Sequence, residues 1–367
     1  MPSTEPARPG PLPVEQWPIL EADPAPEECT AKLQAMGLGD GLPVLPPTRA
    51  RLERMLDGIA DPHASHGALP PLRGPVSAHA VGYQAVLAGC EPAWLDVVMA
   101  AVQACLEPEV NTLGLLTTTG TATIAVMLDD GAARAVGANA GANCLGPGNR
   151  ANAAIGRAVQ LSLAAIGGAF PGLVDMATMG QPGKYTFCFA EAGGTPWLPP
   201  LHERRGLPPG GPAVTVMGVT GTAEIVAAWS TSPEAILETI AGSLTPLGAF
   251  SPTTRRFGGG EQFVLVPREI ADILEQAGWS PARVQSALFE LGAMPASQLP
   301  AAFRRETLER NWGSPAGGAD PVAPVDIAAS PQDVHLILTG GVGAKVTHLP
   351  TWSGGSRSVT RAVEPLR

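Results

Sequence analysis

The chain has 367 residues with 44 glycines, 39 prolines and 5% aromatic residues, a composition typical of a globular protein with a large aliphatic core and many tight turns. Its 33 acidic and 23 basic residues give a net charge of −10 without any run of Lys or Arg, which argues against nucleic acid or an anionic membrane as the main partner. No apolar run has the roughly 18 residues of a membrane span, and the proline-rich start lacks the apolar core of a signal peptide, so we expect a cytoplasmic protein with a disordered arm over residues 1–20.

The elements predicted along the chain alternate between helices and strands. A helix is expected over 25–36, followed by a short buried strand, a proline turn and a second helix within 40–60. The same order of strand, proline and helix recurs over 263–276. A second repeated pattern is a helix that begins at a proline, at Pro92 and at Pro281. Proline favours the first position of a helix.

A third repeated pattern is an apolar run that ends in Thr-Gly, as in LGLLTTTGTATI, VTVMGVTGTAEI and HLILTGGVGAK. Short aliphatic strands between longer helices predict an α/β fold with mostly parallel sheets flanked by helices, built from repeated strand-turn-helix units, with pseudo-duplication as an option. The Thr-Gly turns would then lie at the carboxyl ends of strands, where such sheets bind ligands. The run LPPGG at 207–211 is the expected boundary between an α/β domain over 21–206 and a second α/β half over 212–367.

A glycine-rich turn that ends at Gly148 leads into an amphipathic helix predicted over 150–166, with Asn149 as its N-cap. Arg150 places a cation where the unpaired N–H groups already make the helix start positive, and Arg157 lies two turns later on the same side. A carboxylate or phosphate ligand would satisfy both arginines and the N–H groups. The alternatives are a partner Asp or Glu, or two solvated arginines.

Five reduced cysteines are expected, because their number is odd and none are closely paired. Cys90 stands before a predicted helix, where the helix dipole would favour its thiolate as nucleophile or base. In GKYTFCFAE, read as a strand, Lys184 and Cys188 share one face and could act as cation and thiolate. Tyr185 and Glu191 are candidate acid–base groups on the other face. The alternative for the cysteines is a role as small buried hydrophobes.

Two further groups of residues are candidates for substrate binding. Asn111, Thr117, Thr118 and Thr119 offer an amide, hydroxyls and N–H groups for a carboxylate or an oxyanion, although turns commonly use the same residues. Only three of the 23 basic residues are lysines, so Lys345, in another glycine-rich loop, is a candidate as well.

Several familiar motifs are missing. There is no GxGxxG fingerprint after a strand, no complete phosphate loop, no HExxH and no GxSxG, so we expect no cofactor. His63 and His66, in DPHASHG, give only a weak metal signal, and no metal ligands are assigned.

The segments AGCEP, LGPGNRANAAIGRA, PGKYTFCFAE and LTGGVGA give the chain, from residue 40 onward, a resemblance to a poorly characterised bacterial family associated with proteins that bear a UGSC thiol or selenol motif. This chain has no UGSC or CGSC segment of its own. The resemblance implies thiol chemistry and brings no specific activity with it.

Our leading hypothesis is a homo-oligomeric enzyme that binds a small anionic organic molecule bearing a carboxylate or phosphate, with cysteine-assisted hydrolysis or lyase-type cleavage. It requires Cys90, Arg150, Lys184 and the Thr-Gly turns to meet in one pocket. The alternatives are a non-catalytic subunit that binds a ligand or a partner in a thiol or selenol redox system, and a metal-dependent hydrolase.

Overall fold

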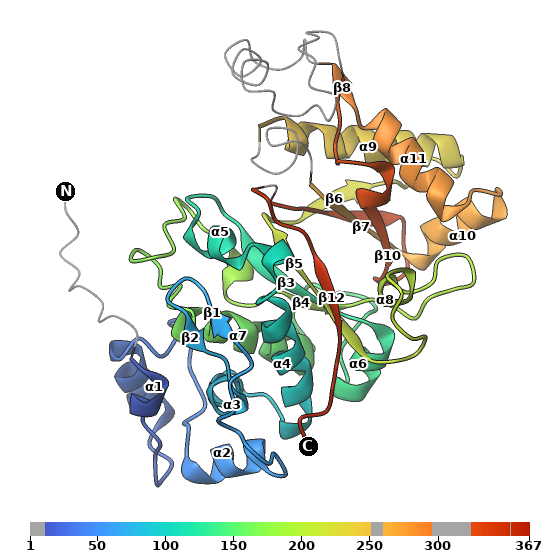
Figure 1. The fold of residues 1–367 in the computed structure, drawn as a ribbon. Coiled ribbons are helices and arrows are strands. Elements are labelled where there is room, and N and C mark those ends of the chain that lie inside the picture. Colours follow the sequence, from blue (N-terminus) through green and yellow to red (C-terminus); the bar gives the residue numbers. More distant parts are fainter. Residues whose placement is uncertain (1–11, 251–259, 296–323, 353) are drawn as a thin grey trace.

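The computed structural model describes residues 12–250, 260–295, 324–352 and 354–367. Two four-stranded sheets form its centre, and helices cover the outer side of each sheet (Figure 1). The layers are therefore helix, sheet, sheet and helix. This arrangement confirms an α/β class.

The first sheet has the order β12-β5-β3-β4. Its strands are β3 (Thr123–Leu128), β4 (Cys188–Ala190), β5 (Ala213–Val219) and β12 (Val359–Ala362). Strand β3 is parallel to β4 and antiparallel to β5, and β5 is antiparallel to β12. In the register, Val126 lies opposite Cys188 on one side and Val216 on the other.

The second sheet has the order β10-β7-β11-β6 and repeats this pattern of directions. Its strands are β6 (Ala223–Val226), β7 (Gln262–Val266), β10 (Val334–Leu338) and β11 (Lys345–Pro350). Strand β7 is parallel to β10 and antiparallel to β11, and β11 is antiparallel to β6.

The prediction of mostly parallel sheets is wrong, because each sheet has one parallel and two antiparallel pairings. Only the connections from β3 to β4 and from β7 to β10 return a strand in the same direction. The predicted boundary at 207–211 does not separate the two sheets, because β5 and β12 lie after it and join the first sheet. Strand β6 follows β5 but joins the second sheet, and β12 follows β11 but joins the first.

The alternation of side chains along the strands divides the interior into three cores. On the outer face of the first sheet, Ile124 and Val126 pack with helices α3 (Ala78–Ala88), α4 (Leu95–Ala104) and α7 (Arg150–Ala165). Their neighbours along β3, such as Met127, face the second sheet and pack with Phe263 and Ile337.

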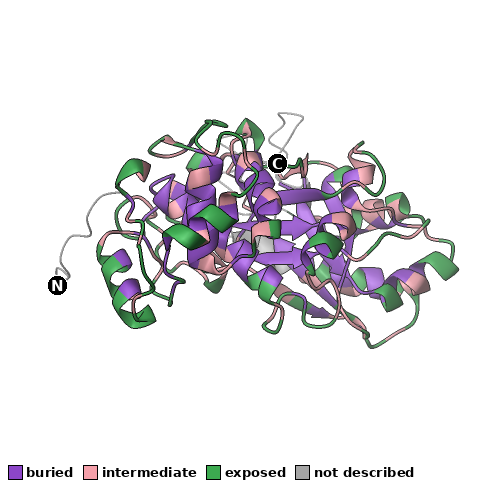
Figure 2. Cartoon of the chain, turned by 90° about the horizontal axis from the view of Figure 1, so that it is seen from below, coloured by how far each residue is buried: buried purple, intermediate pink, exposed green. Residues whose placement is uncertain are grey.

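The third core lies between the second sheet and its helices, which are α9 (Pro233–Phe250), α10 (Arg268–Gln276) and α11 (Pro281–Leu291). Figure 2 shows buried residues gathered along the strands and on the helix faces that meet them.

The remaining helices and strands are short and lie around these layers. They are α1 (Pro26–Ala35), α2 (Arg49–Leu56), α5 (Thr112–Thr117), α6 (Asp130–Val136), α8 (Leu201–Arg204), β1 (Ala68–Leu69), β2 (Gly74–Pro75), β8 (Met294–Pro295) and β9 (Pro324–Val325). The helices expected over 25–36 and 150–166 are confirmed as α1 and α7 to within about a residue at each end.

Residues 1–11 of the expected arm lie outside the described residues, whereas 12–20 pack against the protein. Trp17 is buried and its indole Nε1 donates to the Leu12 carbonyl, while the hydroxyl of Tyr83 donates to the Pro18 carbonyl at 2.9 Å. Within the described part of the chain, no helix combines the length and the apolar character needed to cross a membrane.

Candidate functional site

A cavity of about 650 Å³ opens at the amino end of β3, alongside the second half of α7. The loop that follows α7 completes its wall. Its apolar lining includes Leu116, Leu161, Leu163 and Phe170. Of the residues predicted to form a site, Lys184 and Tyr185 lie on this wall, and the rest lie elsewhere in the described structure.

Lys184 projects its ammonium to Asp175, with an Nζ–Oδ2 distance of 2.5 Å. The two side chains are only 21% and 12% exposed, so this ion pair is partly shielded from water. The other oxygen of Asp175 accepts from the amide of Ala177 at 3.1 Å, which fixes the carboxylate within the loop. Sequence patterns did not identify Asp175, because an acid in a loop carries no signal of its own.

The expected strand 183–191 is corrected by the structure. Residues 182–184 form a 3-10 turn in which the amide of Lys184 bonds to Gln181 and that of Tyr185 bonds to Pro182, and strand β4 begins only at Cys188. Proline and glycine in this segment favour a turn over a ladder, so Lys184 and Cys188 do not share a strand face. Tyr185 lies on the pocket wall with 46% of its surface exposed.

Two glutamines supply further polar groups on the pocket wall. The Gln160 Nε2 donates to the Ile124 carbonyl at 2.7 Å and to the hydroxyl of Thr123 at 3.2 Å. The Gln181 Nε2 donates to the carbonyl of Thr121, two residues before β3, at 2.6 Å and to that of Val219, the last residue of β5, at 3.1 Å. Both side chains were missed by the sequence analysis, since a glutamine on a helix or in a turn is usually a solvated surface residue.

Arg157 does not present a free cation to a ligand. Its Nε and Nη2 each lie 2.8 Å from an oxygen of Asp40, and its Nη1 donates to the Pro43 carbonyl at 2.9 Å. Asp40 lines the pocket, so Arg157 fixes the loop that forms part of the pocket wall.

Arg150 also has an acidic partner within the chain. It pairs with Glu91 at 3.2 Å, donates to the Gly89 carbonyl at 2.7 Å and lies over the Trp94 ring. Asn149 is the N-cap as predicted, since its side chain accepts from the amide of Asn152 at 3.0 Å. Arg150 at the start of α7 is therefore paired with an acid of the same chain, as the alternative interpretation predicted.

The glycine-rich turn before α7 is held by its own amide side chains. Asn152 donates to the carbonyls of Asn139 and Cys144, and Gly148 has a φ of +115°, a conformation that favours glycine. Gly148 is not part of the pocket wall.

The environment of Cys90 and Cys188 is opposite to the one expected for reactive thiols. Burial raises the pKa of Cys90 to about 12, although the charge of Arg150 acts in the other direction. Burial and the neighbouring Cys90 raise the pKa of Cys188. The helix dipole has little effect here, because Pro92 opens a short 3-10 turn and the thiol is shielded from water.

Glu191 follows β4 but lies in the interior, 1% exposed, where both carboxylate oxygens are close to the Leu201 amide, at 3.2 and 3.0 Å. Burial raises its pKa to about 7, against the effects of this hydrogen bond and of Arg204. Asp129 and His202 are buried nearby, with Oδ2 and Nδ1 3.1 Å apart. Glu191 is not part of the pocket wall.

The predicted oxyanion group precedes β3, so its placement at a carboxyl end is corrected. Asn111 has a left-handed φ of 50° and caps α5 by accepting from the amide of Gly114 at 3.1 Å. Thr117 donates to the Leu113 carbonyl within that helix, and Thr118 Oγ1 accepts from the amide of Gly120. These hydroxyls follow the turn chemistry that was the alternative.

Two more predicted site residues, Thr119 and Lys345, lie outside the pocket wall. The Thr119 carbonyl accepts from the amide of Thr178 at 2.9 Å and so holds the pocket loop, although no Thr119 atom lines the cavity. Lys345 is the exposed first residue of β11, paired in register with Val226 and outside the pocket.

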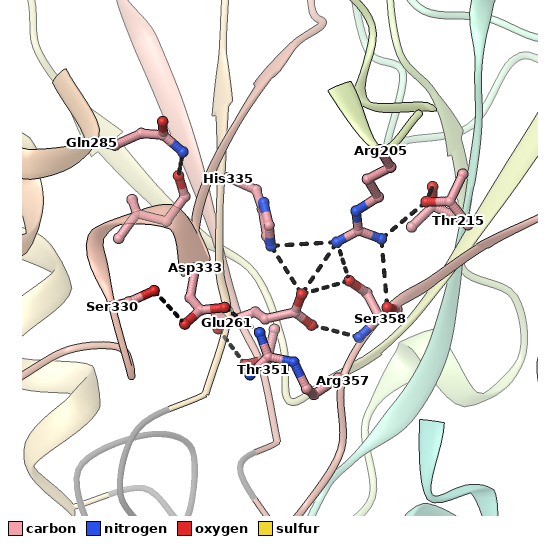
Figure 3. Close-up of polar contacts among 12 residues, drawn as sticks. Arg205, Thr215, Glu261, Gln285, Ser330, Asp333, His335, Thr351, Arg357 and Ser358 are labelled. Carbon is pink, nitrogen blue, oxygen red and sulfur yellow. Dashed lines mark hydrogen bonds and ion pairs between the residues drawn. The ribbon is translucent and has the colours of Figure 1, made fainter. Parts of the chain in front are cut away.

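A second polar cluster lies between the sheets (Figure 3). Glu261 accepts from Ser358 Oγ at 2.8 Å, His335 Nε2 at 2.9 Å and Arg205 Nη2 at 3.2 Å. Burial alone would raise the pKa of Glu261, but the hydrogen bond and charge of His335, the hydrogen bond from the Ser358 amide and the charge of Arg205 lower it to about 2. Arg205 also donates to Thr360 on β12 at 2.9 Å, so the cluster ties that strand to the second sheet.

Within the described residues, no group of three or more His, Cys, Asp or Glu side chains is arranged to hold a metal ion. Comparisons with protein-family models, curated proteins and solved structures find no match to this chain.

Proposed function

We propose that the chain is a small-molecule enzyme that binds an organic acid in the pocket beside α7, with Lys184 as the anchor for the acid and Tyr185 as the proton donor. The observation that carries this proposal is a partly shielded lysine beside a tyrosine on the wall of one cavity of about 650 Å³. A volume in this range is typical of sites for small organic molecules.

An ammonium has three N–H donors, and Asp175 takes one of them in the present pair. The other two are available to a carboxylate or phosphate. The interaction would be stronger than in bulk water because both side chains are largely shielded. Lys184 is also the single cationic side chain on the described pocket wall, so an anionic group has one favoured end of the cavity.

Tyr185 directly follows Lys184, and its hydroxyl has no hydrogen-bond partner among the described residues. A phenol on the pocket wall can donate its proton to an oxygen that develops negative charge as a bond breaks, and the phenolate can take a proton back in the reverse step. Lyase-type cleavage or hydrolysis of the bound acid fits these roles. Cys90 and Cys188 have no part in this proposal, since their thiols are buried, hard to ionise and outside the pocket.

Calorimetric titration with a panel of short organic acids and their phosphate analogues tests the binding step. We expect Lys184→Met to weaken acid binding at least tenfold, whereas Lys345→Met, which removes an exposed lysine outside the pocket, leaves it unchanged. Equal binding by both variants would reject Lys184 as the anchor.

Product analysis by NMR tests the chemical step on whichever acid binds. We expect Tyr185→Phe to retain binding and lose turnover by about a hundredfold or more. Binding without turnover in the wild-type protein would instead favour the non-catalytic alternative, a ligand-binding subunit.

The fold supports one further proposal, that the two sheets descend from a duplicated unit. Both have the same order of parallel and antiparallel pairings. When the chain is divided between β6 and β7, the last strand of each part, β6 or β12, joins the sheet that the other part forms.

A further inference from the structure

We propose that the ligand of this pocket carries a hydroxyl or amino group beside its acidic group, and that the side-chain oxygens of Gln160 and Gln181 recognise it. This inference rests on the proposed function, because it assigns the substrate class of the same pocket. It makes the expected ligand a hydroxy acid or an amino acid with a hydrocarbon portion.

The orientation of both amides is fixed by their partners. A backbone carbonyl can only accept a hydrogen bond, so the atom that contacts Ile124 O at 2.7 Å must be the Gln160 nitrogen. The same reasoning applies to Gln181, whose nitrogen contacts two carbonyl oxygens at 2.6 and 3.1 Å. Rotating either amide would place two oxygens against each other.

This orientation leaves Oε1 of each glutamine as an acceptor. Neither oxygen has a hydrogen-bond partner among the described residues. The two side-chain polar atoms of Gln84 are fully buried without a partner, whereas the oxygens of Gln160 and Gln181 are not. Both residues line the cavity, and we infer that these oxygens are the acceptors for a bound molecule.

The remaining charges on the pocket wall are balanced. Asp40 is paired with Arg157, and Asp175 is paired with Lys184. Lys184 keeps two N–H donors that Asp175 does not take, so the acidic group of a ligand has its partner there. The two glutamine oxygens require an N–H or O–H donor. An acid without such a donor would displace water from these oxygens and leave them unsatisfied, which is the basis for rejecting it.

The rest of the lining is hydrocarbon, including Leu116, Leu161, Leu163 and Phe170. These side chains favour an aliphatic or aromatic portion in the ligand. The simplest ligands with all three features are 2-hydroxy and 2-amino acids with an apolar side chain.

A matched series of acids tests this inference by calorimetry. The probes are 4-methylpentanoate, 2-hydroxy-4-methylpentanoate and leucine, with a parallel series built on 3-phenylpropanoate. In the wild-type protein we expect the hydroxy or amino acid to bind about tenfold or more tightly than the plain acid. Gln160→Met and Gln181→Met should each reduce this preference to less than about threefold.

Gln285→Met is the matched control, since Gln285 also donates an amide hydrogen to a strand carbonyl, Val334 at 2.7 Å, but lies outside the pocket. It should keep the full preference. Circular dichroism melting curves identify any variant that fails to fold, and either glutamine variant alone suffices for the test.

The outcomes separate this inference from the proposed function. Plain acids that bind through Lys184 as tightly as their hydroxy and amino counterparts would overturn the inference and leave the proposed function standing. A preference that persists in both glutamine variants would also overturn it. If no acid in either series and none of the phosphate analogues binds, both proposals fall.

Discussion

The guanidinium of Arg157 contacts both carboxylate oxygens of Asp40, 117 residues earlier in the chain, at 2.8 Å each. The two side chains are 14% and 17% exposed. This pair joins the loop at 39–43 to the middle of α7, and Asp40 is part of the pocket wall. An arginine that the sequence suggested as a ligand anchor thus shapes the pocket through an acid of the same chain.

Replacing Arg157 with Ala should destabilise the protein by about 2–4 kcal/mol, because it leaves the shielded Asp40 carboxylate without its cation. Urea denaturation of the wild type and the variant measures the change. Arg268→Ala is the control, since its pair with Asp272 joins adjacent turns of α10, is 58% and 36% exposed and should contribute no more than about 0.5 kcal/mol. Equal losses for the two variants would show that the Arg157 pair is no more important than a surface pair.

Glu191 should make stability depend on pH between about 4.5 and 7. The unfolded chain loses this proton near 4.5, whereas burial keeps it on the folded chain until about 7, so the folded state binds more protons across this window. The contribution of Glu191 is therefore largest at the acidic end and declines as pH rises, by up to about 3 kcal/mol.

Glu191→Gln isolates this effect, because glutamine keeps an acceptor for the Leu201 amide and cannot ionise. The free energy of unfolding of the wild type minus that of the variant should fall from pH 4.5 to 7 and then level off. Buried His348, whose pKa is lowered by burial to about 3, acts in the opposite direction in both proteins and cancels in the difference. A difference that is flat with pH would contradict the prediction.

Local patterns predicted helix α7 and its cap well, because its apolar periodicity and the N-cap preference of Asn149 depend only on neighbouring residues. They could not identify Glu91 as the partner of Arg150, which lies 59 residues away. Segment 183–191 alternates like a strand, yet the turn that contains Pro182 prevails over that pattern.

In the candidate site as well, local patterns identified some residues and missed those that are brought together only by packing. Lys184 and Tyr185 were found because lysine is rare in this chain and tyrosine rarer still. Gln160, Gln181 and Asp175 come together only through the packing of α7, the ends of two strands and one loop. The mixed sheets depend on exchanged strands, which no local pattern reports.

Replacing Arg205 with Met should loosen strand β12, because Arg205 donates to Glu261 and to Thr360 and so connects that strand with the second sheet (Figure 3). We expect amide hydrogen exchange over 359–362 to accelerate about tenfold or more, measured by mass spectrometry. Arg361→Ala is the control on the same strand, since its contact with Glu107 is long, at 3.5 Å, and 34% and 43% exposed. Unchanged exchange in the Arg205 variant would show that the cluster does not hold β12.

Cys90 and Cys188 should be unreactive in the folded protein. Alkylation requires the thiolate, and a pKa of about 12 leaves only about one thiol in 10⁴ ionised at pH 8, before the shielding of an 8% exposed residue is considered. Iodoacetamide labelling of the native protein, read site by site by mass spectrometry, should therefore modify both at least a thousandfold more slowly than the same cysteines in guanidinium. A Cys90→Ser variant confirms the assignment of the labelled peptide and shows whether Cys188 becomes more reactive when its neighbour is replaced. Rapid labelling of either thiol near pH 7 would mean that the folded protein exposes and ionises it, and the cysteine would then return as the nucleophile in place of acid–base chemistry at Lys184 and Tyr185.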